Sequence, residues 1–543
     1  MKLQKLILIN QHGKNGTIYK YVAYSNGYNK NVTKLFSLGS TEKLLKERPD
    51  AIELIKKAIE GFNQNSNIED VKNRINEFLG RKENIESDNI VMGEKIIKSV
   101  IKSLNISDSF PKNIKSKNHL KIFEYLITRR IERQTSILSS FNEVNKSTFS
   151  ITTKKDSFYD VLTKVYQNKD AIFKNLNINI KRITNHTDNR IYFDSTTIYF
   201  ESFDKDGIRQ SGFSKDGKFK EDQIVLAMAC YNTGIPFHMK VFPGNTADCN
   251  TLIDFIKEVR DIYGIKTLYV IADRGMWTNK NIEFLVQNNY YYLISNRAKV
   301  GSKKFKTYIA ERSDFIKIND DFLIKEQIVT PEIQRNRSHV FRRVITYNKE
   351  RADKDKYDRE ILINNFIKLQ NKDGFINEKR IIGSKGGRYY DAVSKSLYRL
   401  NTEKVKEDEL LDGIYVYETN IMDLDALEIC RVYAEQWKIE ENFRSLKSVI
   451  QIRPVYLSLD EHIIGHSVIC FISLVIMKLL HYMLIKIIKI TFAEMTKVLT
   501  ELTSLVYIDT KSRKIIWEKR NREVSDFNLW KTYDMLEKIT SNF

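Results

Sequence analysis

The sequence contains few cysteines. The 543-residue chain has four, Cys230, Cys249, Cys430 and Cys470, and no two of them form a CxxC pair. This argues against a disulfide framework and a structural zinc site, and it favours the reducing cytosol. Hydrophobic residues make up 42% of the chain and charged residues 29%, which excludes disordered and collagen-like proteins. The length predicts two to four domains.

Long apolar runs are also missing. The most membrane-like stretch extends from Ile463 to Met477 and is interrupted by Lys478. It falls short of the ~20 residues that span a bilayer, so we expect a helix buried in a protein core. No secretory signal peptide is recognisable at the start of the sequence. We therefore expect a cytoplasmic protein without a membrane partner.

Basic residues exceed acidic ones, with 89 Lys and Arg against 69 Asp and Glu, giving a net charge of +20. Such an excess favours a polyanionic partner, nucleic acid before membrane. An AT-rich genome would also raise the Lys content, so the charge alone does not decide the function.

The residue pattern changes several times along the chain. The strand-like Thr17–Tyr24 is followed by Asn26-Gly27, a hairpin signal. In the helical region that follows, Arg129, Arg130 and Arg133 could contact phosphates, although such charges more often form a solvated face. The predicted regions are 1–45, a small β-hairpin region; 46–185, a mostly helical DNA-binding region; 186–300 and 416–480, two parts of one α/β domain; 301–415, a β-rich insertion; and 481–543, a helical C-terminal region.

Two aspartates occupy unusual positions in the predicted α/β domain. Asp194 lies inside the strand-like Ile191–Phe200, and Asp273 follows the apolar Thr267–Ala272. A buried, unpaired carboxylate is costly, so such residues usually pair, hydrogen-bond or bind a metal. Either aspartate alone is more often a turn or cap residue, whereas two on neighbouring strands indicate a site.

A third carboxylate lies on a predicted helix from Tyr433 to Lys447. At about 100° per residue, Tyr433, Gln436, Glu440 and Lys447 fall within a sector of roughly 60°, flanked by Trp437 and Arg444. An ordinary core face would be aliphatic. A solvated amphipathic face remains the alternative for this segment taken alone.

These motifs resemble the DDE transposases of bacterial insertion sequences, in the branch whose catalytic Glu lies in a Y-x2-R-x3-E-x6-K signature. Tyr433, Glu440 and Lys447 stand at the signature spacing, and Gln436 stands where the family has Arg. The resemblance extends over about residues 190–480. The other fragments that carry it are Trp437-Lys-Ile-Glu-Glu, Gly212-Phe-Ser-Lys-Asp-Gly, Val241-Phe-Pro-Gly-Asn-Thr, Ile271-Ala-Asp-Arg-Gly-Met, Lys447-Ser and Arg453-Pro-Val-Tyr.

The resemblance implies a ribonuclease-H-like α/β fold, with a mixed sheet flanked by helices, a β-rich insertion after the second aspartate, and helical N- and C-terminal regions. It implies that Asp194, Asp273 and Glu440 are the catalytic triad and bind two Mg²⁺ or Mn²⁺ ions. Hard cations prefer such oxygen ligands, and two ions can assist an in-line displacement at phosphorus.

The implied partners are double-stranded DNA, as inverted-repeat ends and as target, and further copies of the chain in a homodimer or higher oligomer. The bacterial relatives act in the cytoplasm, at the nucleoid. DNA contacts are expected from Tyr433, Gln436, Trp437, Arg444, Lys447 and Tyr415. Relatives that form hairpin ends use a Trp on the strand before the signature helix, whereas this chain has no Trp between 278 and 436 and offers Tyr415 there. Together with Gln436, this argues against a hairpin route.

Two other functions remain open from the sequence. One is a structure-specific, metal-dependent DNA nuclease on the same fold, which would cleave DNA without strand transfer. The other is a DNA-binding protein derived from a transposase that no longer catalyses; retention of all three carboxylates argues against it.

Overall fold

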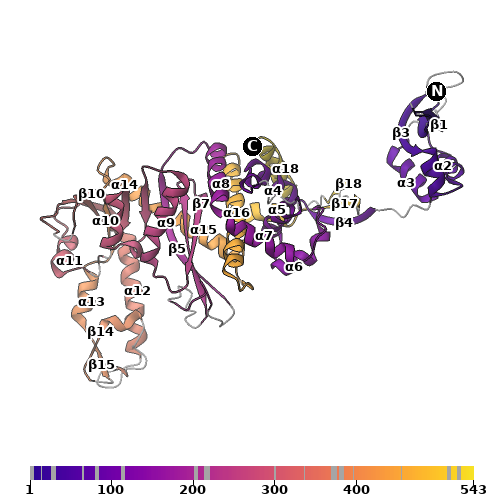
Figure 1. The fold of residues 1–543 in the computed structure, drawn as a ribbon. Helices are drawn as coiled ribbons and strands as arrows, with labels where there is room; N and C mark the ends of the chain where they lie inside the picture. Colours follow the sequence, from indigo (N-terminus) through magenta and orange to yellow (C-terminus); the bar gives the residue numbers. More distant parts are fainter. Residues whose placement is uncertain are drawn as a thin grey trace. The chain divides into compact units, whose positions relative to one another are not determined.

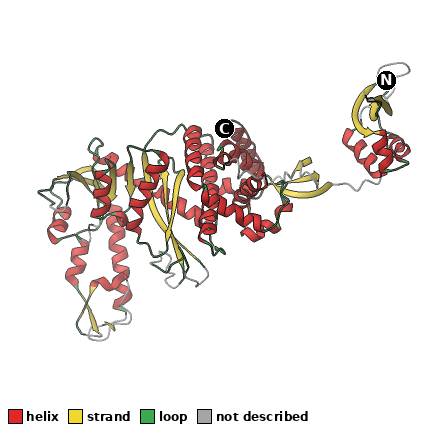
Figure 2. Ribbon diagram, viewed as in Figure 1, coloured by secondary structure: helices red, strands yellow, loops and turns green. Residues whose placement is uncertain are grey.

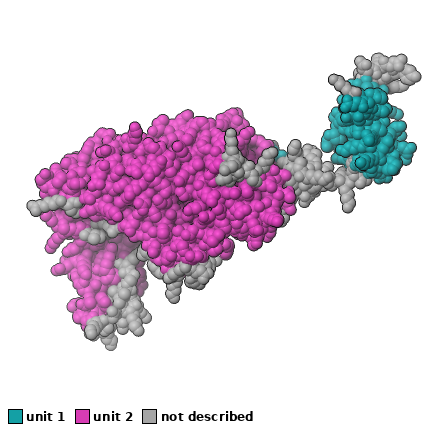
Figure 3. All heavy atoms as spheres, in the orientation of Figure 1, with its two compact units in different colours: residues 1–90, 504–520 teal, residues 91–503, 521–543 magenta. Residues whose placement is uncertain are grey.

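The computed structural model describes residues 5–543 apart from 14, 26–31, 64–65, 80–84, 112–116, 201–205, 213–220, 297, 299–300, 335–336, 369–375, 378–384, 395–396, 454, 510–514 and 522–526. The predicted Asn26-Gly27 turn and most of the Gly212 motif lie outside the described residues. The chain forms two compact units, coloured separately in Figure 3. Unit 1 comprises Met1–Ile90 and Ser504–Arg520, and unit 2 comprises Val91–Thr503 and Asn521–Phe543.

Unit 1 begins with a three-stranded antiparallel sheet, β1 (Leu6–His12), β2 (Ile18–Tyr24) and β3 (Thr33–Ser40). Three short helices pack against it around buried apolar side chains such as Val22 and Ile55. They are α1 (Thr41–Glu47), α2 (Ala51–Ile59) and α3 (Ile68–Phe78). The second sheet of this unit consists of β4 (Ile85–Val91), β17 (Thr503–Asp509) and β18 (Ile515–Arg520).

These elements differ from the predicted regions at both ends of the chain. The region predicted as 46–185 divides at Ile90, because its first helices share an apolar core with the N-terminal sheet. The C-terminal region predicted as helical contains the hairpin β17–β18, whose outer partner is the N-terminal β4.

Helices form one part of unit 2 (Figures 1 and 2). The longest, α16 (Asp460–Ile485), is long and apolar enough to cross a membrane by length and composition alone, but 78% of its apolar window is buried inside the protein. The buried core helix expected around Ile463–Met477 is thus confirmed. The other helices are α4 (Gly93–Ser103), α5 (Lys117–Glu132), α6 (Ile137–Asn142), α7 (Asp156–Gln167), α8 (Lys169–Thr184), α17 (Phe492–Thr500) and α18 (Phe527–Ser541).

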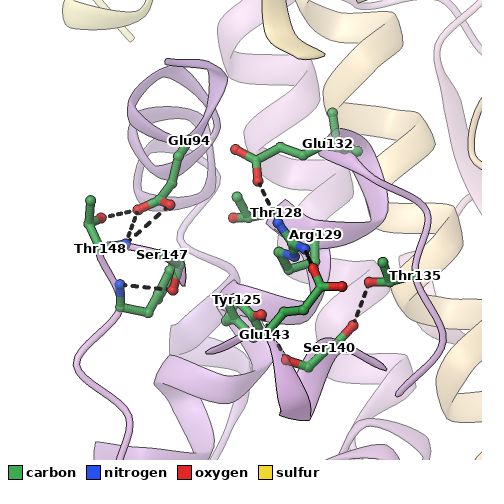
Figure 4. A network of polar contacts seen from close by, with 12 residues as sticks. Glu94, Tyr125, Thr128, Arg129, Glu132, Thr135, Ser140, Glu143, Ser147 and Thr148 are labelled. Carbon is green, nitrogen blue, oxygen red and sulfur yellow. Dashed lines mark hydrogen bonds and ion pairs between the residues drawn. The ribbon is translucent and has the colours of Figure 1, made fainter. Parts of the chain in front are cut away.

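A buried polar network fixes α5 within this helical part (Figure 4). Arg129 is only 3% exposed and forms ion pairs with Glu132 and Glu143. Burial, followed by the negative charge of Glu94, raises the pKa of Glu132 well above its usual value. Arg129 therefore serves the core and is not a surface phosphate contact.

A nine-stranded mixed sheet forms the rest of unit 2, in the order β10-β11-β12-β16-β9-β8-β5-β6-β7. The central strands β5, β8 and β9 run parallel, and the remaining pairs are antiparallel. Bounds of the core strands are β5 (Arg190–Tyr199), β6 (Gln223–Tyr231), β7 (Pro236–Pro243), β8 (Tyr269–Ala272), β9 (Tyr291–Ser295) and β16 (Ile414–Thr419).

Helices cover both faces of the central strands. The ring of Phe193 on β5 packs 4.8 Å from Phe255 of α9 (Asp248–Tyr263). The neighbouring Tyr192, which faces the other side, donates from its hydroxyl to Glu435, just before α15 (Trp437–Ser448). Two further helices complete the core, α10 (Asn279–Gln287) and α14 (Ala426–Ala434).

The predicted insertion lies between β9 and β16, and it extends the core sheet. Its strands β10 (Ile316–Asn319), β11 (Phe322–Val329) and β12 (Phe341–Asn348) join that sheet through β16. The other insertion elements are α11 (Lys303–Ala310), α12 (Lys349–Ile367), α13 (Thr402–Glu409) and a small sheet of β13 (Ile376–Asn377), β15 (Leu397–Leu400) and β14 (Tyr390–Ala392). The predicted fold class, a mixed α/β sheet flanked by helices with an insertion and helical terminal regions, is confirmed.

Candidate active site

Asp194 and Asp273 lie side by side on neighbouring parallel strands. The register of β5 and β8 pairs Phe193 with Ala272, and the next residue of each chain segment is one of the aspartates. Neighbouring strands are about 4.8 Å apart, so the two carboxylates emerge close together. The strand signals in the sequence thus led to the correct neighbours.

Local hydrogen bonds orient both aspartates. Asp194 is half-buried in an otherwise buried strand, and its carboxylate accepts a 2.7 Å bond from the backbone N–H of Ser195. Asp273 directly follows β8 and caps a 3-10 turn, η3 (Arg274–Met276), by accepting from the N–H of Gly275. These bonds fix the orientation of both carboxylates.

The signature segment departs from the single helix predicted from Tyr433 to Lys447. Tyr433 is in α14, and α15 begins at Trp437. In between, the N–H of Gln436 donates to the Tyr433 carbonyl at 3.0 Å, an i to i−3 bond that tightens the backbone. Glu440 consequently lies in the first turn of a new helix and is exposed.

Side-chain bonds anchor the start of α15 to the sheet. Gln436 donates from Nε2 to the carbonyl of Phe193 at 3.1 Å, the residue directly before Asp194. Lys438 and Asn442 donate to the carbonyls of Asn232 and Gly234, in the turn between β6 and β7. These bonds fix the helix that carries Glu440 against the strand that carries Asp194.

Tyr433 lies close enough to two of the predicted catalytic carboxylates, Asp273 and Glu440, for their charges to act on its phenol. Burial raises the pKa of its phenol, and the negative charges of Asp273 and, more weakly, Glu440 raise it further. The phenol therefore stays protonated in the vicinity of both groups. Its ring packs against Tyr417 of β16, with centroids 4.6 Å apart.

The three predicted catalytic side chains suit hard divalent cations, because all of them offer carboxylate oxygens. Two of the three, the aspartates, lie in or directly after adjacent strands. In the part of the chain that the structure describes, no group of three or more His, Cys, Asp and Glu side chains is gathered closely enough to hold a metal ion. The structure thus shows a chemically suitable pair of aspartates, with Glu440 on a helix anchored beside them. It does not show a preformed three-ligand site.

The predicted DNA contacts differ in their exposure. Trp437 is 55% exposed, Arg444 is exposed, and Lys447 is half-buried, so side chains of α15 remain accessible. Gln436 is only 6% exposed and its amide nitrogen bonds inward. This placement does not support a DNA contact at Gln436, because the amide holds the helix to the strand.

Tyr415 on β16 is half-buried and belongs to an aromatic row. Its ring is nearly parallel to that of Tyr417, with centroids 6.4 Å apart, and the guanidinium of Arg351 lies 5.5 Å from its centroid. The row continues from Tyr417 to Tyr433. A base stacking on Tyr415 would have to share the ring with Arg351.

A buried carboxylate that the sequence reading missed supports the Asp273 loop. Glu418 on β16 is fully buried and accepts a 2.7 Å bond from the indole N–H of Trp277, four residues after Asp273. Arg343 donates to it at 3.0 Å and Arg337 at 3.5 Å. The sequence contains a signal for this role, since Glu418, like Asp194, is a carboxylate in an apolar strand and needs a polar partner. Trp277 and Arg343 also border a cavity of about 680 Å³.

A solved structure described as "Cryo-EM structure of piggyBac transposase synaptic complex with hairpin DNA (SNHP)" is similar, with 10% sequence identity, coverage of 82% of each chain and a TM-score of 0.37. That similarity is too distant to bear on the site. No curated protein matches the chain. The family model described as "Transposase DDE domain" matches residues 185–476, which is more than half of the 543 residues and spans the positions of Asp194, Asp273 and Glu440. The chain belongs to the family of proteins with a transposase DDE domain.

Proposed function

We propose that this protein is the transposase of a bacterial insertion sequence, which cleaves DNA at the ends of its element and joins them to target DNA. Asp194, Asp273 and Glu440 are the proposed catalytic residues. The observation that carries the proposal is the register of Phe193 with Ala272, which sets the two aspartates side by side; the Gln436 bond to Phe193 attaches the segment of Glu440 to the same strand. The family match includes all three positions.

In this proposal the three carboxylates hold two Mg²⁺ or Mn²⁺ ions. Such ions would activate the attacking hydroxyl and neutralise charge on the leaving oxygen. The bond from Gln436 to Phe193 and the bonds of Lys438 and Asn442 keep Glu440 positioned beside the aspartates. The protonated phenol of Tyr433 donates a hydrogen bond to a phosphate oxygen.

The proposed partner is double-stranded DNA, both the inverted-repeat ends and the target. The net charge of +20 favours a polyanion, and α15 offers the exposed Trp437 and Arg444 together with Lys447. An exposed indole stacks on a displaced base of any sequence, whereas the cations meet phosphates. We propose that a homodimer or higher oligomer brings two element ends together in the bacterial cytoplasm, at the nucleoid.

Strand transfer separates this proposal from its alternatives. The test uses the full chain, Mg²⁺, a supercoiled target plasmid and duplex DNA taken from the flanks of the gene, where terminal inverted repeats are expected. Cleavage at the repeat followed by joining to the plasmid supports a transposase. Cleavage without joining supports the structure-specific nuclease, and specific binding without cleavage supports the non-catalytic DNA-binding protein.

A further inference from the structure

A second cavity lies beside the segment that follows α15. It encloses about 370 Å³ between residues of α5 to α7, the described residues 451, 453 and 455–457, and His466 of α16. All of its lining residues belong to unit 2. Arg453 connects it to the catalytic strand, because its guanidinium lies 4.4 Å from the ring centroid of Tyr199, the last residue of β5.

The charge of this cavity is positive. Among the described residues, its lining includes Arg130 and Arg453 and no Asp or Glu. Arg130 is only 7% exposed, and it donates at 3.2 Å to the carbonyl of Gln451 on the opposite wall. Two guanidinium groups in one lining suit an anion such as a phosphate, which arginine binds with a planar pair of donors.

A buried histidine adds a polar group that the protein leaves incompletely bonded. His466 of α16 lines the cavity and is only 4% exposed. Its Nε2 lies 3.4 Å from the carbonyl of Ile452, whereas its buried Nδ1 has no hydrogen-bond partner among the described protein groups. Buried polar atoms are nearly always paired, so this nitrogen leaves room for a hydrogen-bond donor from outside the fold.

The backbone of the cavity is held in an unusual conformation at two places. Five described non-glycine residues have positive φ; three are asparagines, which tolerate it, and the other two are Gln134 and Gln451. Both glutamines line this cavity, with φ of 47° and 50°. Backbone outliers of this kind cluster at ligand-binding sites.

Aromatic side chains complete the lining. Tyr159 is half-buried, and Tyr456 is 71% exposed at the rim. Aromatic faces accept any nucleobase by stacking. Guanidinium groups, amides and phenols around one hollow therefore match the three parts of a nucleotide better than they match inorganic phosphate alone.

We propose that this cavity binds one nucleotide of a DNA strand, with its phosphate between Arg130 and Arg453 and its base against Tyr456. The proposal rests on the proposed function, because the cleaved bond is placed at the proposed catalytic residue Asp194. Tyr199 follows Asp194 by five residues on β5, about 16 Å along a strand that rises ~3.3 Å per residue. A DNA strand that runs along β5 would cover that distance in about five nucleotides at ~3.4 Å each, which places the bound nucleotide about five positions from the cleaved bond.

Photocrosslinking tests this placement in the full chain. Duplexes taken from the flanks of the gene carry 5-iododeoxyuridine at one of the ten positions next to the cleaved bond, and binding is measured in Ca²⁺. We expect a crosslink to the peptide that contains Tyr456, strongest near position five and weakened by Arg453→Gln. Crosslinks that avoid residues 451–457 at every position would overturn the proposal.

Affinity measurements provide the matched control. Arg453→Gln should weaken duplex binding about tenfold and reduce its salt dependence by about one phosphate contact. Arg260→Gln, an exposed arginine on α9, and Tyr357→Ala, an exposed tyrosine on α12, should leave binding unchanged. Tyr456→Ala should also weaken binding, and because this side chain is 71% exposed, the variant is expected to fold even if Arg453→Gln does not.

Two outcomes separate this inference from the proposed function. A crosslink at Tyr456 in a protein that never cleaves would refute only the proposed catalysis. Normal cleavage and joining, with equal affinity for Tyr456→Ala and Tyr357→Ala, would refute only the nucleotide site. Competition by free deoxyadenosine monophosphate as effective as that by duplex would show a free-nucleotide site and overturn the DNA assignment.

Discussion

The side-chain amide of Gln436 donates a 3.1 Å hydrogen bond to the backbone carbonyl of Phe193. Phe193 directly precedes Asp194, and Gln436 stands four residues before Glu440, so this one bond links the segments that carry two of the proposed catalytic residues. Gln436 is buried, and its side chain lies between helix and sheet. The residue that departs from the family signature thus has a structural role in this chain.

Replacing Gln436 should therefore lower the stability of the fold more than it weakens DNA binding. Gln436→Leu removes this buried hydrogen bond, which should lower the free energy of unfolding by about 0.5–1.5 kcal/mol. The exposed neighbour Trp437 should show the opposite pattern. Trp437→Ala should change stability by less than about 0.5 kcal/mol but weaken DNA binding by about 1–3 kcal/mol through lost stacking. Urea unfolding and duplex titration of both variants check this; equal stability losses would contradict it.

Glu418 provides a second test of how the site is supported. Glu418→Gln removes the charge that faces Arg337 and Arg343, both buried, and should lower stability by about 3–5 kcal/mol. It should also loosen Trp277 and with it the loop after Asp273. Asp320→Asn in the exposed ion pair with Lys317 is the control and should cost at most about 1 kcal/mol. Similar melting temperatures for the two variants would show that the Glu418 network does not stabilise the core.

His466 should make the fold sensitive to acid. Burial, and next the positive charge of Arg130, lowers the pKa of this imidazole from 6.5 to about 3; Cys470 and the Ile452 carbonyl are its other polar neighbours. Below pH 6.5 the His466 imidazole binds a proton in the unfolded chain, whereas in the folded protein it stays unprotonated down to about pH 3. The contribution to stability is therefore present above pH 6.5 and is lost as the pH falls towards 3.

For this single group the loss between pH 7.5 and 5.5 amounts to about 1.4 kcal/mol. His466→Gln should lose about that much less than the wild type over the same interval. Unfolding midpoints of the two proteins, measured at both pH values, give the difference. An identical pH dependence would show that His466 is accessible to protons in the folded state.

We predict that this enzyme accumulates little hairpin at excised ends. A charged hydrogen bond contributes ~1.5–3 kcal/mol against ~1 for a neutral one, and Gln436 is uncharged and bonded inward. Tyr415 offers less stacking surface than a Trp and already has Arg351 over its ring. Denaturing gels of cleavage products would show a hairpin directly, and a dominant hairpin band would contradict this prediction while leaving the catalytic residues unaffected.

The strands of the central sheet could be predicted from the sequence because they are apolar, short and separated by clear turns. Asp194 and Asp273 were recognised as polar residues in such strands, and the parallel register places them together. The broken helix at Gln436 could not be predicted, since local spacing does not reveal a tertiary bond to Phe193. The network of Glu418 depends on arginines some 75–81 residues away in the chain, which no local pattern connects.

The most direct test of the catalytic assignment is end cleavage by Asp273→Asn in Mg²⁺, measured beside Asp423→Asn, an exposed carboxylate in the loop before α14. Removal of this proposed metal-binding carboxylate should slow cleavage by at least about 10³-fold, the scale seen for groups essential to catalysis. Binding of the same duplex in Ca²⁺ should persist, and Asp423→Asn should cleave at the wild-type rate. Cleavage by Asp273→Asn at the wild-type rate would contradict the active site proposed for this protein.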